Sequence, residues 1–186
     1  AMTRAHTLVL SVMNGLESEQ IIARACGPEK VALSIAIGID AVYQDQAYTY
    51  KSPGKIIFGT PPPPARGPDN TQLKRIAGAL DNAGIPNEIP EDINRTLWWK
   101  FMINVGINQS SAVLRAPYGV FQSSARAREL MTRLMEEVIC LARARSVDLT
   151  RADLDEWIRI LHTLSPDGKT SMLQDIEAKR KTEVEI

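Results

Sequence analysis

The sequence has few of the residues from which metal sites and nucleophilic triads are built. Of its 186 residues only two are cysteines and two are histidines, and aromatic residues make up 5%. Cys26 and Cys140 lie far apart and form no Cys-x-x-Cys or metal-ligand spacing, so we expect free, buried thiols in a reducing cytoplasm. His6 and His162 are the only histidines, so a histidine metal site or a Ser-His triad is not indicated, and we expect no bound metal.

An excess of charge of either sign is also missing, as is any long apolar run. The chain carries 22 basic and 22 acidic residues, which gives no electrostatic footprint for nucleic acid or an anionic membrane. Its longest apolar runs, TLVLSVM and VALSIAIGI, are far shorter than the ~20 residues that span a membrane. We also expect no secretory leader. With 44% apolar and 24% charged residues, the composition is typical of a soluble globular protein. We expect it to be cytoplasmic.

The start of the chain has the pattern of a β-α-β unit. Residues 7–13 form a continuous apolar run that ends in Asn14-Gly15, which is typical of a buried strand followed by a tight turn. Residues 17–26 are predicted as a short helix, and residues 30–39 as a second buried strand. Two such strands joined by a helix are expected to run parallel.

A hairpin, a connector and a helix are predicted next. Residues 47–59 read as a β-hairpin with Pro53 and Gly54 at the centre of a type II turn. The proline-rich residues 60–70 are predicted to be a stiff, exposed connector; a PxxP ligand is the alternative. Residues 71–83 are predicted to be helical.

The remainder of the chain is predicted to be all helix, with a domain boundary near Glu91. The expected helices are residues 94–115, 124–146, 151–164 and one that starts at about Ser171. Ser171 opens the sequence SMLQ, the pattern of a Ser-x-x-Gln capping box. Within residues 124–146 the spacing of the apolar side chains predicts a core face formed by Leu130, Leu134, Val138, Leu141, Met131, Met135 and Ile139.

One stretch, WWKFMINVGINQSSAVL from Trp98 to Leu114, combines an apolar helix with a narrow polar stripe. At about 100° per residue, Lys100, Asn104, Asn108 and Ser111 fall on one side of the helix, with Asn108 about 80° from Lys100. Asparagine is a poor helix former, so helix propensity does not explain why two asparagines lie four residues apart in this helix.

Two explanations of this polar stripe stay open from the residues alone. It can be the solvated face of an amphipathic helix, although such faces usually carry Glu, Lys, Arg or Gln. It can also line a polar hollow that binds a small anionic ligand. If the stripe were buried and unpaired, each amide would cost roughly 1–3 kcal/mol, and the ammonium more.

Three segments of the chain resemble a known family. LVLSVMNGLESEQII, GIPNEIPEDINRTLWWKFMINVGINQSSAVLRAPYG and SMLQDIEAKRKTEVEI are similar to 2-dehydropantoate 2-reductase (ketopantoate reductase), in the family's order and over nearly the whole chain. The W-x-K-x-x-x-N-x-x-x-N pattern of the second segment is highly specific. The resemblance implies an α+β fold. Residues 1–91 would be the C-terminal portion of a Rossmann-like NADP-binding domain, and residues 92–186 an all-helical domain of the 6-phosphogluconate dehydrogenase C-terminal-like type.

The activity implied by the resemblance is NADPH-dependent reduction of 2-dehydropantoate to (R)-pantoate, in pantothenate and coenzyme A biosynthesis. Lys100 would be the general acid, a role worth roughly 10²–10⁴-fold in rate. Asn104 and Asn108 would bind the substrate and donate hydrogen bonds without adding charge. A surface lysine that extends its ammonium into solvent is the alternative for Lys100.

Three further roles follow from the same resemblance. Ser171 would bind the substrate carboxylate, Glu183 would be a catalytic residue that holds the substrate hydroxyl, and Asn14 would lie between cofactor and substrate. Each has a purely structural alternative. Ser171 can be only a helix cap, Glu183 can belong to a solvated charged face, and Asn14 can serve only its turn.

The family's dinucleotide-binding motif, G-x-G-x-x-G, is not found in this sequence. We therefore expect the chain to be a fragment that by itself binds NADPH poorly and turns over negligibly. Two other functions stay open: a reductase of another 2-keto acid, and a non-catalytic helical module for binding or dimerisation. The resemblance is also compatible with a homodimer formed through the helices of the second half. An in-frame G-x-G-x-x-G segment in the coding DNA upstream of Met2 would favour the reductase.

Overall fold

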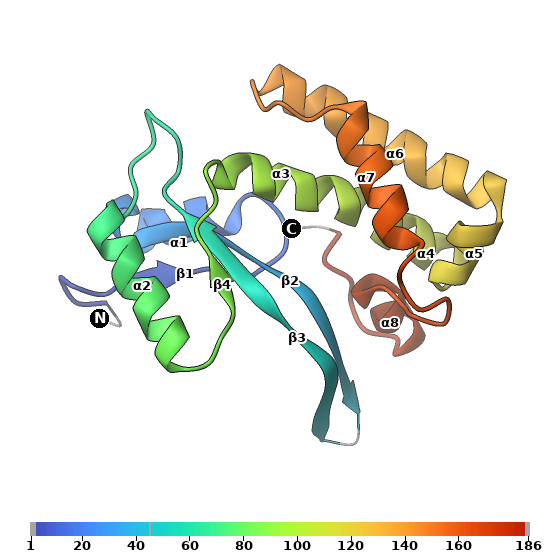
Figure 1. The fold of residues 1–186 in the computed structure, drawn as a ribbon, viewed down its shortest axis with the longest axis horizontal. Helices are drawn as coiled ribbons and strands as arrows, with labels where there is room; N and C mark the ends of the chain where they lie inside the picture. The colour runs from blue at the N-terminus through green and yellow to red at the C-terminus, as the bar shows by residue number, and fades with distance from the viewer. Residues whose placement is uncertain (1–2, 45, 185–186) are drawn as a thin grey trace. The chain divides into compact units, whose positions relative to one another are not determined.

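The computed structural model describes residues 3–44 and 46–184 and shows a mixture of helices with a small sheet (Figure 1). This agrees with the α+β class expected from the sequence. By its internal contacts the chain divides into two compact units, Ala1–Leu97 and Trp98–Ile186. The two units are described separately below.

The first unit contains a four-stranded sheet in the order β1-β2-β3-β4. β1 and β2 are parallel, β2 and β3 are antiparallel, and β3 and β4 are parallel. The strands and helices of this unit are β1 (Val9–Leu10), α1 (Ser18–Cys26), the 3₁₀ turn η1 (Pro28–Lys30), β2 (Val31–Gln44), β3 (Ala47–Gly59), α2 (Asn70–Asn82) and β4 (Asn87–Glu88).

The predicted β-α-β unit is confirmed, although its first strand is shorter and less buried than expected. β1 pairs with β2 only at Val9 and Leu10, and both residues are half-buried. The side chains of Val12 and Met13 are 49% and 51% exposed, so the apolar run continues past the paired strand. α1 ends at Gly27, whose φ of 97° suits a residue without a Cβ.

The hairpin was predicted in the wrong place. Pro53 and Gly54 lie inside a single strand, β3, and the chain reverses before it, next to Gln46 with φ 61°. Gly54 lies opposite Gly38 in the ladder, and both have positive φ. A Cβ on Gly54 would lie 2.4 Å from the carbonyl oxygen of Ile37. The register shift of the ribbon lies close by, between Asp40 and Ala41. Pro53 and Gly54 are therefore paired residues beside a bulge and not the turn of the hairpin.

The sheet buries apolar side chains on both faces. On one face Ala32 and Phe58 pack against Leu73 and Ile76 of α2. The other face packs against the start of α3 (Ile93–Ile103), through a cluster formed by Ile35, Ile57, Ile93 and Leu97. The division by contacts therefore falls within α3, whereas the boundary expected near Glu91 precedes this helix.

The connector and the helix after it agree with the prediction. Residues 60–69 form a largely exposed loop without regular structure. α2 then begins with a capping box, in which Asp69 and Gln72 each accept a hydrogen bond from the other's backbone N–H at 2.8 Å. The short strand β4 was not predicted, because two residues carry no periodic signal.

The second unit is helical, as predicted. After the end of α3 it contains the π-helical turn η2 (Asn104–Asn108), α4 (Gln109–Leu114), α5 (Tyr118–Ser123), α6 (Ala125–Ala144), α7 (Arg151–Leu161) and α8 (Ser171–Glu177). The turn η2 and the short helix α5 were not predicted. The largest fully buried side chains of its core are those of Met102, Ile107, Phe121, Met131, Met135, Val138, Leu149, Leu154 and Leu161.

The face of α6 that enters the core is narrower than predicted. Met131, Met135 and Val138 are buried as expected, but Leu130 and Leu141 are 37% and 56% exposed. A helix presents one apolar stripe to a core, and the prediction joined two neighbouring stripes into one.

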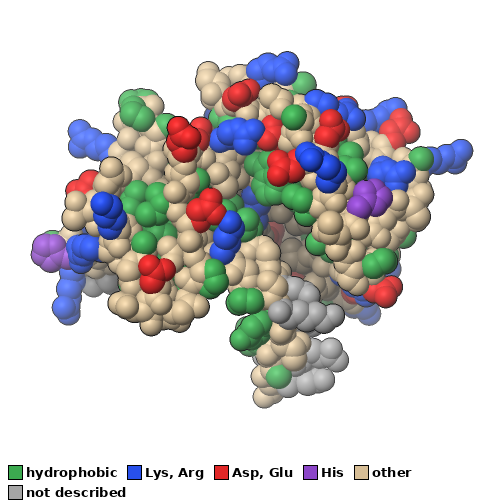
Figure 2. All heavy atoms as spheres, in the orientation of Figure 1, with side chains coloured by type: hydrophobic (Ala, Val, Ile, Leu, Met, Phe, Trp, Pro, Cys, Tyr) green, Lys and Arg blue, Asp and Glu red, His purple; other side chains and the backbone are tan. Residues whose placement is uncertain are grey.

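The surface has no concentration of one sign of charge on the face shown in Figure 2, where acidic and basic side chains alternate. Within the described part of the chain no helix is long and apolar enough to cross a membrane. Both thiols are free, as predicted, but Cys140 is exposed and Cys26 is half-buried, so the expected burial was wrong.

Candidate functional site

The polar stripe lies where α3 passes into α4 through the π-helical turn. Lys100 is in the last turn of α3, and Asn104 and Asn108 are the first and last residues of η2. All three side chains are half-buried among the apolar core positions of the same helix. The amide Nδ2 of Asn108 donates a hydrogen bond to Oδ1 of Asn104 over 3.3 Å. The two asparagines therefore face the same side.

The π turn corrects the predicted position of Asn108. A π turn closes its hydrogen bond from residue i to i+5, so each residue turns the helix by less than the ~100° of an α-helix. Asn108 is consequently carried back over Asn104 instead of drifting about 80° from Lys100. Such single π turns are frequent at functional sites.

A glycine and a serine support the wider turn. Gly106 lies against the buried side chain of Met135, and a Cβ on this glycine would lie 2.4 Å from Met135 Cγ. The hydroxyl of Ser110 donates to the carbonyl oxygen of Gly106 over 2.6 Å. The hydroxyl thus gives this backbone carbonyl a buried hydrogen-bond partner within the π turn.

The two residues predicted to be catalytic act on each other electrostatically. Burial of Lys100 lowers the pKa of its ammonium from 10.5, and the carboxylate of Glu183 opposes this by raising it. Glu183 follows α8 and is itself exposed. A partly desolvated ammonium close to an accessible carboxylate can donate a proton, and it can bind an anionic oxygen.

Ser171 is placed differently from the prediction. It is the first residue of α8 and is exposed, and the cap of this helix is Thr170, whose hydroxyl accepts from the N–H of Leu173 at 3.1 Å. The predicted Ser171 capping box is therefore wrong, because the chain enters the helix one residue earlier. Thr170 was missed by the sequence analysis. Its only signal was its position immediately before SMLQ.

Asn14 lies in the first unit, in the turn that follows β1. The chain bends over residues 14–17, and Gly15 has φ 98°. The ends of this loop are tied by buried polar groups: Ser11 Oγ lies 2.7 Å from Ser18 Oγ, and Ser18 Oγ donates to the buried carboxylate of Glu19 over 2.8 Å. No sequence pattern predicted this network. The cofactor role of Asn14 stays a prediction.

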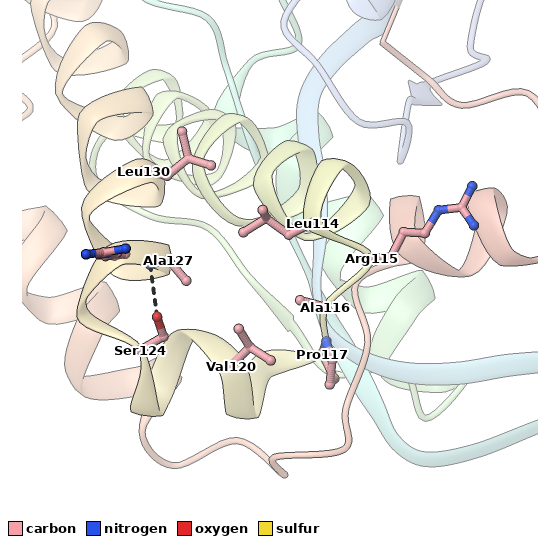
Figure 3. Close-up of a pocket in the computed structure, with 9 residues that line it drawn as sticks. Leu114, Arg115, Ala116, Pro117, Val120, Ser124, Ala127 and Leu130 are labelled. Atoms are coloured by element: carbon pink, nitrogen blue, oxygen red, sulfur yellow. Dashed lines mark hydrogen bonds between the residues drawn. The ribbon is translucent and has the colours of Figure 1, made fainter.

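A groove of about 460 Å³ lies elsewhere in the second unit, between the end of α4, α5 and the start of α6 (Figure 3). Its apolar lining is formed by Leu114, Ala116, Pro117, Val120, Ala127 and Leu130, with Arg115, Ser124 and Arg126 at its sides. None of the predicted site residues lines it. The groove has no group suited to acid catalysis, so the polar stripe remains the candidate site.

Comparison with known proteins places the second half of the chain in a family. Residues 92–186 match the family model described as ketopantoate reductase PanE/ApbA C terminal. The 2-dehydropantoate 2-reductase of Aquifex aeolicus is 25% identical over 185 residues, which are 97% of this chain and 58% of that protein. The enzyme of the same name from Pyrobaculum aerophilum is 32% identical over 113 residues, 61% of this chain and 40% of that protein.

Solved structures show the same fold. The 2-dehydropantoate 2-reductase of Geobacter metallireducens has a TM-score of 0.84 at 23% identity, covering 96% of this chain and 58% of that one. D-mandelate dehydrogenase in complex with NADH has a TM-score of 0.85 at 18% identity, covering 99% and 61%. A dimeric ketopantoate reductase of Staphylococcus aureus has a TM-score of 0.81 at 19% identity, covering 96% and 57%.

The matching fold and the matching family model both point to a family of oxidoreductases. The chain belongs to the ketopantoate reductase, or 2-dehydropantoate 2-reductase, family. It spans 58% of the length of the Aquifex aeolicus relative.

Proposed function

We propose that this chain carries the substrate site of an NADPH-dependent 2-dehydropantoate 2-reductase, which forms (R)-pantoate for pantothenate and coenzyme A biosynthesis. The observation that supports this most is the polar stripe itself. A half-buried lysine, influenced by Glu183, and two asparagines that face one another lie on one apolar helix. Groups of these types recognise a small 2-keto acid.

Lys100 has the central role in this proposal. When bound, NADPH supplies the hydride for the C2 carbonyl carbon of the substrate. As negative charge develops on the carbonyl oxygen, the Lys100 ammonium stabilises it and transfers a proton to it from Nζ. Because burial lowers the pKa of Lys100, the proton is less tightly held than on an exposed lysine.

The other residues position the substrate in this proposal. Asn104 and Asn108 donate amide hydrogen bonds to its oxygens. Ser171, which is exposed at the start of α8, binds the carboxylate through its hydroxyl, and Glu183 accepts from the substrate hydroxyl. The resemblance assigns Asn14 to the cofactor side.

The residues of this chain fit only part of an NADPH site. The loop after β1 turns at Gly15 with positive φ and is held at its ends by buried hydroxyls, so it is suited to a fixed contact through Asn14. The G-x-G-x-x-G cradle for the pyrophosphate is not in the sequence. We therefore expect weak NADPH binding and negligible turnover by the chain alone.

Binding of the keto acid tests the proposal without requiring turnover. 2-Dehydropantoate titrated into the 186-residue chain should shift the NMR signals of the Asn104 and Asn108 side-chain amides. Lys100→Ala should weaken this binding about tenfold or more, because the carboxylate and carbonyl oxygens lose a charged partner. Lys74→Ala, on α2, is the control and should change nothing. If 2-dehydropantoate shifts no signal of the stripe, the proposal is wrong.

A second substrate is favoured by one comparison. D-mandelate dehydrogenase, whose fold matches, has been solved with NADH and anilino(oxo)acetate. The polar stripe is suited to the carboxylate and carbonyl groups that all 2-keto acids share. It is less clearly suited to one particular substituent on the carbonyl carbon. A phenyl-substituted 2-keto acid that bound more tightly than 2-dehydropantoate in the same titration would favour this alternative.

The remaining alternative is a helical module that acts by binding or dimerisation without catalysis. A homodimer is compatible with this alternative and equally with the reductase, so it does not distinguish the two. Binding of 2-dehydropantoate that depends on Lys100 would favour the reductase over the module.

A further inference from the structure

We infer that Ser111 and Thr170 are positioning residues, whose buried hydroxyls lock the start of α8 onto the helix that carries the asparagines. This inference rests on the proposed function, because it concerns how Ser171 is held relative to Asn108. Ser111 Oγ and Thr170 Oγ1 are 2.6 Å apart and join residues separated by 59 positions in the chain.

Each hydroxyl of this pair also has a backbone partner. The N–H of Leu173 donates to Thr170 Oγ1 at 3.1 Å, and Ser111 Oγ donates to the carbonyl oxygen of Asn108 at 3.1 Å. Between the two side chains either hydroxyl can be the donor. Contacts through the two hydroxyls therefore link the backbone of α8 to the backbone of Asn108.

Burial makes this chain a rigid link. Ser111 and Thr170 are 1% and 2% exposed, so water does not compete for their hydroxyls. In such surroundings consecutive hydrogen bonds strengthen one another, and a missing partner leaves a polar group unsatisfied. Both hydroxyls are thus held in one arrangement.

The loop before α8 is fixed separately. The N–H of Tyr118 donates to the carbonyl of Gly168 at 3.0 Å, and that of Gly119 donates to the carbonyl of Pro166 at 2.8 Å. These bonds tie the loop to α5. The Ser111–Thr170 pair instead joins α8 to the helical segment that carries the polar stripe.

The pair connects two proposed substrate-binding residues. Thr170 immediately precedes Ser171, and Ser111 bonds to the carbonyl of Asn108. A displacement of about 1 Å at a binding residue can cost up to roughly 10²-fold. The distance between the proposed carboxylate and carbonyl contacts of the substrate would therefore depend on this pair.

The test compares Ser111→Ala with two matched variants in the full 186-residue chain. Ser111→Ala leaves Thr170 able to cap α8. Ser123→Ala is the control, because the Ser123 hydroxyl bonds only to the Gly119 carbonyl of its own helix, at 2.8 Å. Thr170→Ser keeps the hydroxyl. We expect Ser111→Ala to weaken 2-dehydropantoate binding about tenfold in a calorimetric titration, and the other two variants to bind like the parent chain.

A measurement without substrate separates this inference from the proposed function. In the ligand-free chain, Ser111→Ala should shift the NMR signals of the Ser171 and Leu173 amides and of the Asn108 side-chain amide, and should speed hydrogen exchange at Leu173. Thr170→Ser should not. If these signals are unchanged in Ser111→Ala, the positioning role is overturned, whether or not the parent chain binds 2-dehydropantoate. If they move and the parent chain binds none, the link stands and only the proposed function fails.

Discussion

Lys100 is held between two opposing influences, and this makes it the most informative single residue. Desolvation disfavours its charged form and lowers the pKa, and the carboxylate of Glu183 favours that form. A bound anionic substrate would add a second favourable partner for the ammonium. The balance between burial and neighbouring negative charge therefore sets the pKa of Lys100.

Glu183→Gln should lower the pKa of Lys100 further. Removal of the carboxylate removes an influence that raises this pKa, while burial continues to lower it. The pKa can be followed by NMR titration of isotopically labelled lysine. Binding of an anionic keto acid should accordingly decline at a lower pH than in the parent chain, because the ammonium loses its proton earlier.

The matched control for that substitution is Glu177→Gln. Glu177 is on α8 and pairs with Lys169 through both carboxylate oxygens at 2.8 Å. Its replacement should leave the Lys100 titration where it was. An unchanged Lys100 pKa in Glu183→Gln would show that the two groups do not interact in solution.

At the scale of elements, the π turn depends on packing between two helices. Gly106 is in η2 and meets Met135 of α6, whereas Gly78, in the interior of α2, has no atom within 4 Å of the position of an added Cβ. A side chain added at Gly106 would therefore meet a packed core, whereas one added at Gly78 would meet open space. Intrinsic helix propensity favours alanine at both positions.

Gly106→Ala and Gly78→Ala should change stability in opposite directions. Gly78→Ala should raise the free energy of unfolding by about 0.5–1 kcal/mol. Gly106→Ala should lower it by about 1–3 kcal/mol, because its Cβ would overlap Met135 in a filled core. Urea unfolding measures both. A stabilised Gly106→Ala chain would mean that Met135 moves aside without cost, and that the π turn does not need the glycine.

The elements that were predicted correctly have local causes. The capping box of Asp69 and Gln72 and the N-cap of α7 at Thr150 involve residues three positions apart. Two of the errors arose where residues distant in the sequence decide the local structure. Pro53-Gly54 has the composition of a turn, yet β2 pairs across it. The π turn has no local signature, because Met135 supplies its counterpart.

For the molecule as a whole, equal numbers of acidic and basic residues leave no net charge to keep copies apart. The groove of Figure 3 also exposes apolar side chains: Leu114, Val120 and Leu130 are 45%, 36% and 37% exposed. An apolar patch of this kind on a neutral surface favours self-association.

Leu130→Glu should therefore reduce self-association of the chain at neutral pH, as measured by sedimentation velocity. The added carboxylate would be desolvated if two such grooves met. Leu141→Glu is the control. Leu141 is on the same helix and is more exposed, but its neighbours are Arg133, Glu136 and Glu137. If both variants self-associate as strongly as the parent chain, the groove is not the surface through which the copies associate.

The sequence by itself determined the α+β class, the helical second half and the polar stripe, because periodicity, caps and apolar runs act between near neighbours. The spacing of Lys100, Asn104 and Asn108 was visible in the same way. Only the tertiary structure decided that the asparagines face one another, that Glu183 acts on Lys100 and that Thr170 meets Ser111. The last two pairings join residues far apart along the chain. The two asparagines are only four positions apart, but they meet through a π turn that packs against Met135, so all three pairings exist only once the helices have packed.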